Sequence, residues 1–300
     1  MIVADRYINP FTDFGFKKLF GTEMNKDLLM DFLNELIHCQ GKIKEIKYLN
    51  PEQLGRNEID RRAVFDIFCE TETGDTFIVE MQKARHNFFK DRSVYYASFP
   101  IREQGIKGKW NYCLKAVYTV GILNFVFNES KDDDNYYHSE VKLMDTQKKT
   151  VFYDKLTFIY LELPKFNKSI EQLETRFEKW LYLLKNLPDL QDLPPQFQER
   201  IFEKFFHVAE IAKMSKQELS EYEVSLKIYR DWYSVLETAE MEGIEKGIEK
   251  GMEKGMEKGM EKGKIEVAKK LFNKGMSIED ISDATDLSEE YIIELIKKLQ

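Results

Sequence analysis

Hydrophobic and polar positions alternate in two short runs within the first third of the chain. Ala63–Glu70 and Thr76–Gln82 both have the period-two pattern of β-strands, and Thr73–Asp75 between them carries a turn signal. Alternation sends every second side chain to the same side of a strand. The apolar positions that share one side are Phe65, Ile67, Cys69, Phe77, Val79 and Met81. The pattern predicts a β-hairpin.

The other side of this hairpin carries carboxylates among apolar residues. Asp66 lies on the first predicted strand, and Glu80 and Gln82 lie on the second. Strands that are apolar on both sides usually lie inside a sheet, where a carboxylate is costly unless it is paired or binds a cation. The mixed side therefore indicates a candidate site.

The length of the loop decides whether these polar residues share a side. A three-residue loop, Thr73–Asp75, places Asp66 opposite Gln82 and diagonal to Glu80, at about 7–8 Å between backbones. A two-residue loop would turn Asp66 toward the apolar side of the other strand. Three-residue hairpins with glycine in the left-handed position are common, so we predict the odd-length loop.

Helical periodicity flanks the hairpin on both sides. Thr12 or Asp13 is a candidate N-cap for the first helix, and Pro100 is expected to kink or end the helix that follows the hairpin. The predicted elements are a helix over 12–20, a helix over 25–37, a strand over 42–49, the hairpin, a helix over 86–103 and a strand over 113–127. This α-β-β-β-α-β order predicts an α/β core of about 125 residues.

The patterns divide the whole chain into four predicted parts. These are an α/β domain over 1–164 with added strands at 141–144 and 156–163, an α-helical cap over 165–240, a Gly-[Ile/Met]-Glu-Lys repeat over 241–263, and a short helical tail over 264–300. Pro164 ends the strand character of the first part.

The repeat places a glycine at every fourth residue from Gly243 to Gly263. Its Ile and Met residues stay near one face of a helix, but each glycine costs about 1 kcal/mol relative to alanine. Two interpretations remain open, a variable linker and a helix that dimerises. The tail has the outline of a helix-turn-helix, yet Glu289 and Glu290 begin its last helix, which favours protein contact over DNA reading. Residues 241–300 are thus the candidate for homo-oligomerisation.

Composition narrows the class of protein. The chain has 300 residues and is 43% hydrophobic, which is ample for a core, and no apolar run approaches the length of a membrane span. The N-terminus has no apparent signal peptide, and Cys39, Cys69 and Cys113 are expected to be reduced core residues of a cytoplasmic protein. The net charge of −8 argues mildly against nucleic-acid binding, although residues 1–125 are nearly balanced.

Asp66 and the Glu80-x-Gln82 pair suit metal-dependent hydrolysis of a phosphodiester. Mg²⁺ prefers oxygen ligands and keeps several waters, so one or two protein carboxylates suffice. Such an ion lowers the pKa of a bound water and stabilises charge on the phosphate. Gln82 has the reach to orient the attacking water, but an amide neither accepts its proton nor carries a positive charge.

Several motifs resemble those of one family. NPFTDFGFKKLFG at 9–21, FDI at 65–67, IVEMQ at 78–82 and RSVYY at 92–96 resemble the PD-(D/E)XK nuclease-family transposases, the recombination-promoting nucleases of bacteria. The repeat and tail are also similar to that family. The resemblance implies a restriction-endonuclease-like fold and DNA cleavage that depends on Mg²⁺ or Mn²⁺.

The resemblance also implies roles for individual residues. Asp66 would be the motif aspartate, Glu80 the second metal ligand, and Asp13 the acidic residue of the N-terminal helical motif and a further candidate metal ligand. Gln82 stands where the motif lysine usually stands. Lys83 is adjacent, but strand alternation predicts that it points to the other face.

Three basic residues are candidates for contacting DNA phosphates, namely Lys17, Arg85 and Arg92. A solvated helix face for Lys17 and ordinary salt bridges for the two arginines are the competing interpretations, and Asp13 is equally suited to capping a helix. The alternative at the level of function is a catalytically inactive nuclease-fold protein that interacts and oligomerises through residues 241–300.

Overall fold

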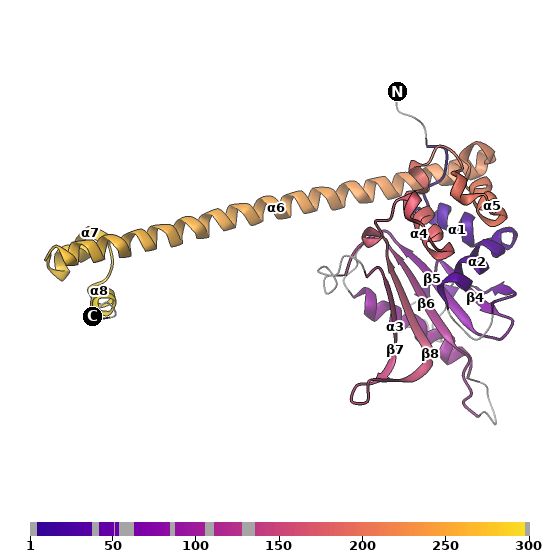
Figure 1. The fold of residues 1–300 in the computed structure, drawn as a ribbon, viewed down its shortest axis with the longest axis horizontal. Coiled ribbons are helices and arrows are strands. Elements are labelled where there is room, and N and C mark those ends of the chain that lie inside the picture. The colour runs from indigo at the N-terminus through magenta and orange to yellow at the C-terminus, as the bar shows by residue number, and fades with distance from the viewer. Residues whose placement is uncertain are drawn as a thin grey trace. The chain divides into compact units, whose positions relative to one another are not determined.

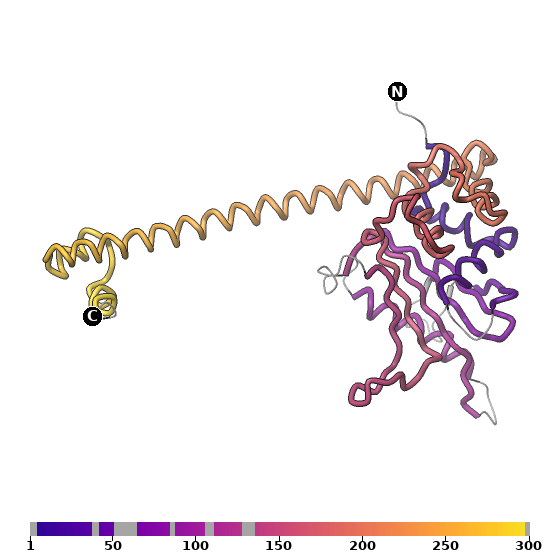
Figure 2. The backbone as a smooth tube through the Cα atoms, viewed as in Figure 1, coloured from indigo at the N-terminus to yellow at the C-terminus, as the bar shows by residue number. Residues whose placement is uncertain are grey.

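The protein has two compact units, Met1–Arg230 and Asp231–Gln300. The computed structural model describes residues 5–37, 42–50, 52–53, 63–84, 88–105, 111–127 and 136–297. The first unit is an α/β domain built on one large sheet, and the second is helical (Figures 1 and 2).

The large sheet has six strands in the order β1-β4-β5-β6-β8-β7. The strands are β1 (Ile46–Tyr48), β4 (Ile67–Thr71), β5 (Thr76–Gln82), β6 (Val117–Leu123), β7 (His138–Asp145) and β8 (Thr150–Glu162). β1, β4 and β5 pair antiparallel, whereas β5, β6 and β8 run parallel and β7 returns antiparallel on β8. The parallel step from β5 to β6 requires a crossover, which α3 (Phe89–Glu103) provides. The predicted order of elements is confirmed, with the added strands extending the sheet.

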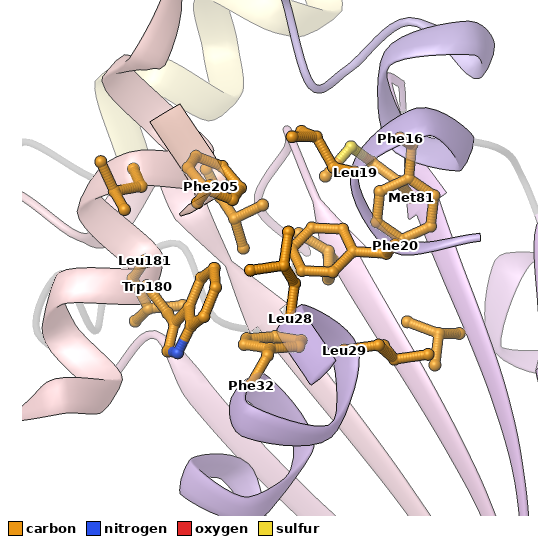
Figure 3. Close-up of a cluster of buried hydrophobic side chains, with 14 of the residues drawn as sticks. Phe16, Leu19, Phe20, Leu28, Leu29, Phe32, Met81, Trp180, Leu181 and Phe205 are labelled. Carbon is orange, nitrogen blue, oxygen red and sulfur yellow. The ribbon is translucent and has the colours of Figure 1, made fainter. Parts of the chain in front are cut away.

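One face of the sheet is covered by four helices, α1 (Asp13–Phe20), α2 (Lys26–Leu36), α4 (Arg176–Asn186) and α5 (Arg200–Ala209). Figure 3 shows the aromatic centre of this core, where Trp180 lies 5.8 Å from Phe20 and 5.4 Å from Phe205, measured between ring centroids. The indole nitrogen of Trp180 donates to Asp31, 2.9 Å away, so the ring is buried without an unpaired donor. The helices after β8 therefore belong to the same core as the sheet.

α3 covers the opposite face. Its Phe99 packs against Phe68 and Ile78 of the hairpin, on the side expected from alternation. Phe65 also lies on this side, 5.3 Å from the Phe68 ring and 5.2 Å from the Tyr96 ring, whereas alternation had placed it with Ile67. The predicted strand over 63–70 is in fact interrupted, because Phe65 and Asp66 are not part of a strand and β4 begins at Ile67.

Other predicted boundaries also changed. Ala63–Val64 form β3, which pairs with β2 (Glu52–Gln53) in a separate two-stranded sheet. Pro100 lies inside α3 and does not end it. Cys69 is buried as predicted, but Cys113 is exposed, and Cys39 lies outside the described residues.

The division between the units falls after Arg230, within the 58-residue helix α6 (Lys216–Asn273). That helix runs through the whole repeat, so the repeat is helical. In the second unit α7 (Ile278–Thr285) and α8 (Glu289–Lys297) share a small core with the end of α6. Short 3-10 helices occur at Glu23–Asn25, Leu163–Lys165, Ile170–Gln172, Leu187–Asp189, Pro195–Phe197 and Ile211–Lys213.

Within the described ranges, no helix is long and apolar enough to cross a bilayer.

The NPFTDFG motif builds the start of α1. Thr12 is the N-cap, because its hydroxyl accepts from the amide of Gly15 at 3.0 Å and donates to the carbonyl of Asn9 at 2.7 Å. The carbonyl of Asn9 lies so close to Gly15 that a Cβ there would collide with it and would lie 2.6 Å from Thr12 Oγ1. The glycine is therefore required by packing at this position.

We expect Gly15→Ala to destabilise the first unit by about 1–3 kcal/mol, because the added methyl group overpacks a rigid backbone contact. Urea unfolding followed by tryptophan fluorescence measures this loss. Gly247→Ala in α6 is the matched control, since a Cβ there meets no atom of the described residues within 4 Å. Equal unfolding midpoints for Gly15→Ala and the wild type would contradict the packing argument.

Candidate active site

The hairpin turn sets the register of the site. The loop has three residues, as predicted, but they are Glu72–Gly74, one position earlier than expected. Thr71 donates its amide to the carbonyl of Asp75 at 2.9 Å, and Gly74 adopts the left-handed conformation with φ +85°. Ile67 consequently pairs with Val79.

This register places Asp66 beside Glu80 rather than opposite Gln82. The amide of Asp66 donates to Glu80 Oε1 at 3.2 Å, and Asp66 Oδ2 accepts from the amide of Met81 at 2.8 Å. The side chain of Asp66 thus replaces the ladder hydrogen bond that an uninterrupted strand would make. Both carboxylates are fixed by the backbone of the neighbouring segment.

Glu80 lies at the centre of a small polar cluster. It is only 5% exposed, and Gln82 Nε2 donates to its Oε2 at 3.1 Å. Arg92 on α3 approaches the same oxygen, with Nη2 3.9 Å away, and its guanidinium lies near the rings of Phe89 and Tyr96. Arg92 Nη2 is buried and has no hydrogen-bond partner among the described residues. The cluster therefore joins Asp66, Glu80 and Gln82, as the sequence predicted, with Arg92 beside them.

The surroundings of the two carboxylates disfavour their charged forms. Burial, and next the Asp66 carboxylate, raise the pKa of Glu80 to about 8. Burial also raises the pKa of Asp66, against the hydrogen bond from Met81. Arg92, at 3.9 Å, does not fully compensate the buried carboxylate of Glu80 beside Asp66. A bound cation would relieve this cost.

The donor set fits a hard divalent cation. Asp66 and Glu80 offer carboxylate oxygens, which Mg²⁺ and Mn²⁺ prefer. Across the described part of the chain, no three or more His, Cys, Asp or Glu side chains are grouped to hold a metal. Two protein carboxylates with water completing the shell match the coordination that Mg²⁺ usually has.

A cavity of about 800 Å³ lies beside Asp66 and is lined by three other candidates, Asp13, Lys17 and Lys83. Alternation predicted that Lys83 points away from the face of Glu80 and Gln82. Lys83 lines the cavity with residues of α1 and α6, on the side where Met81 packs against α1, and Asp66 reaches the same cavity. Burial lowers the pKa of Lys83, while the carboxylates of Asp13 and Asp66 act in the other direction.

The remaining predicted residues have different surroundings. Because Thr12 caps α1, Asp13 is free of that role and pairs with Lys17, with Oδ1 and Nζ 2.9 Å apart. Within the described ranges Asp13 does not join Asp66 and Glu80 in a three-carboxylate group, and its role as a ligand stays a prediction. Arg85 lies outside the described residues.

The fold and the paired carboxylates define an α/β protein with a restriction-endonuclease-like core. The sequence matches the family described as PD-(D/E)XK nuclease family transposase over residues 10–239, and the chain belongs to this family. Members of the PD-(D/E)XK group are generally nucleases and typically use divalent metals. No curated protein and no solved structure matches the chain.

The raised pKa of Glu80 has a measurable consequence in the presence of a chelator. Its pKa is higher in the folded state than the ordinary value of 4.5, so its contribution to stability is complete below pH 4.5 and is lost as pH rises toward 8. We expect Glu80→Gln to become progressively more stable than the wild type across this interval, as measured by urea unfolding at several pH values.

Glu140→Gln on β7 is the control, because Glu140 is exposed. A constant stability difference between Glu80→Gln and the wild type from pH 4.5 to 8 would show that Glu80 is not held in this environment.

Proposed function

We propose that this protein is a divalent-metal-dependent DNA endonuclease of the recombination-promoting, transposase-like type, acting in the cytoplasm. The observation that carries the proposal is the hydrogen bond from the Asp66 amide to the buried carboxylate of Glu80, which brings these two acidic residues together where the hairpin strand is interrupted. Membership of the PD-(D/E)XK family supports DNA as the substrate.

Each site residue has a proposed role. Asp66 and Glu80 hold Mg²⁺ or Mn²⁺, which would lower the pKa of a water molecule and neutralise charge on the phosphate. Gln82, anchored through its hydrogen bond to Glu80, orients the attacking water. Asp13 supports the cation from the cavity side of Asp66.

Two basic residues are proposed to contact the DNA backbone. Arg92 is suited to a phosphate oxygen, because its Nη2 is a buried donor that no described residue satisfies and lies beside Glu80. Lys17 lines the cavity, and its side chain is 47% exposed although it pairs with Asp13. A phosphate could exchange with that surface ion pair at little cost.

We also propose that the chain forms a homo-oligomer through residues 241–300. The repeat helix exposes an apolar stripe whose members are each 58–71% exposed, namely Ile244, Ile248, Met252, Met256 and Met260. A methyl group added to any of the glycines beside this stripe would meet no described atom within 4 Å, so a second helix has room for close approach. This stripe equally supports the second candidate function, an inactive nuclease-fold protein that acts by association.

Alanine at Asp66 is expected to reduce cleavage of plasmid DNA in Mg²⁺ or Mn²⁺ by about 100-fold or more, because the cation loses a ligand. The thermal shift that Mn²⁺ induces should disappear in Glu80→Ala, since only binding to the folded state raises its stability. Asp154→Ala on β8 is the control, because that carboxylate is exposed. Unchanged nicking by Asp66→Ala would refute the assignment and favour the non-catalytic function.

The oligomer is tested by Met252→Gln, Met256→Gln and Met260→Gln in one variant, which removes the apolar stripe while keeping good helix formers. We expect light scattering after size exclusion to show a multimeric wild type and a smaller mass for the variant. Gln at Lys250, Lys254 and Lys258 is the control. A monomeric wild type at tens of micromolar would contradict oligomerisation through this helix.

A further inference from the structure

Lys83 lines the cavity beside Asp66. It directly follows β5, which ends at Gln82, and it lies on the side of the sheet where Met81 packs against α1, together with Asp66, Asp13 and Lys17. Its ammonium is 5.7 Å from the centre of the Tyr229 ring, a contact that holds the long side chain against α6. Lys83 is half-buried, so its charge is less screened than that of a surface lysine.

Gln82 brings no positive charge to the site. Its amide is uncharged, and one of its donors is already used on Glu80 Oε2 at 3.1 Å. A phosphodiester carries a negative charge that increases around phosphorus as water attacks, and a positively charged donor stabilises that charge far better than an amide does. On the cavity side of Asp66, the cations among the described residues that line the wall are Lys17, Lys18 and Lys83.

Two of these three cations are engaged in ion pairs on the helix surface. Lys18 pairs with Glu218 at 2.5 Å, and Lys17 pairs with Asp13 at 2.9 Å. Lys83 directly follows the Glu80-x-Gln82 segment and interacts electrostatically with Asp13 and Asp66. The positive charge closest in sequence to the motif therefore lies on the cavity side of Asp66 and not on the strand face of Glu80 and Gln82.

We propose that Lys83 is a catalytic residue that contacts the scissile phosphate and supplies the positive charge that Gln82 lacks. The inference rests on the proposed function. In the reaction the water oxygen bonds to phosphorus, and the bond from phosphorus to one ester oxygen breaks. The attacking water gives up a proton to solvent, the leaving oxygen keeps the electron pair and takes up a proton from solvent, and the ammonium of Lys83 keeps its own protons throughout.

The cavity also suits the rest of a nucleotide. Phe14, Val224 and Ile228 form an apolar part of its wall next to the lysines. A DNA strand would thus find positive charge for its backbone and apolar surface for a sugar or base within one recess. Lys83 and Asp66 both line this recess, so a strand bound there lies within the field of both side chains.

The test uses the full-length chain and three variants. Two are single substitutions, Lys83→Gln and Lys83→Arg, and the third is a double variant that combines Gln82→Lys with Lys83→Gln. We expect Lys83→Gln to cleave plasmid about 100-fold more slowly in Mn²⁺ while keeping the thermal shift that Mn²⁺ induces. Lys83→Arg, which keeps the charge, and the double variant, which restores a lysine at the adjacent strand position, should each recover most of this loss. Lys142→Gln, which removes a charge on β7 outside the cavity, is the control.

A second measurement does not depend on turnover. The binding of a short fluorescent DNA duplex is followed by anisotropy in EDTA at several salt concentrations. The slope of the logarithm of the binding constant against the logarithm of the salt concentration should be smaller in magnitude by about one in Lys83→Gln than in the wild type. A merely structural role for Lys83 would change the unfolding midpoint and leave this slope unaltered.

The outcomes separate the inference from the proposed function. If Asp66→Ala abolishes cleavage while Lys83→Gln cleaves within threefold of the wild type, the nuclease function stands and the role of Lys83 is overturned. If no variant and no wild-type preparation cleaves DNA, the proposed function fails. In that case DNA binding still tests Lys83, because a salt slope in Lys83→Gln equal to that of the wild type overturns the contact between Lys83 and the phosphate.

Discussion

The hydrogen bond from the amide of Met81 to the carboxylate of Asp66 is the interaction on which the candidate site depends. It forms because the strand before Ile67 is interrupted, which leaves a backbone donor of β5 without a ladder partner. Asp66 satisfies that donor and is thereby held against Glu80, at the cost of bringing two carboxylates together in a buried place.

The first helix contributes to the site through its own local constraints. Thr12 caps α1 and Gly15 admits the carbonyl of Asn9, so the helix begins at a fixed point and presents Asp13 and Lys17 to the cavity. The start of α6 fixes the same segment from the other side, because Tyr222 accepts a hydrogen bond from the amide of Asn9 at 2.9 Å. The motif therefore serves folding and cavity shape together.

The site draws on residues far apart in the sequence. Arg92 comes from the crossover helix that the parallel pairing of β5 and β6 requires, and Lys83 comes from the last turn out of β5. The position of Arg92 does not follow from the period of a strand, because the crossover carries it to Glu80.

Features that depend on neighbouring residues could be predicted from the amino-acid sequence. Turn residues specified an odd-length loop, and an odd loop places position 66 opposite an even-numbered residue of β5, even though the partner is Glu80 and not Gln82. The exact pairing of Asp66 with Glu80, the interruption of the strand at Asp66 and the side to which Phe65 turns emerged from the folded chain alone. They escaped prediction because a strand ends where its pairing partners and packed helices end, and those contacts come from distant parts of the chain.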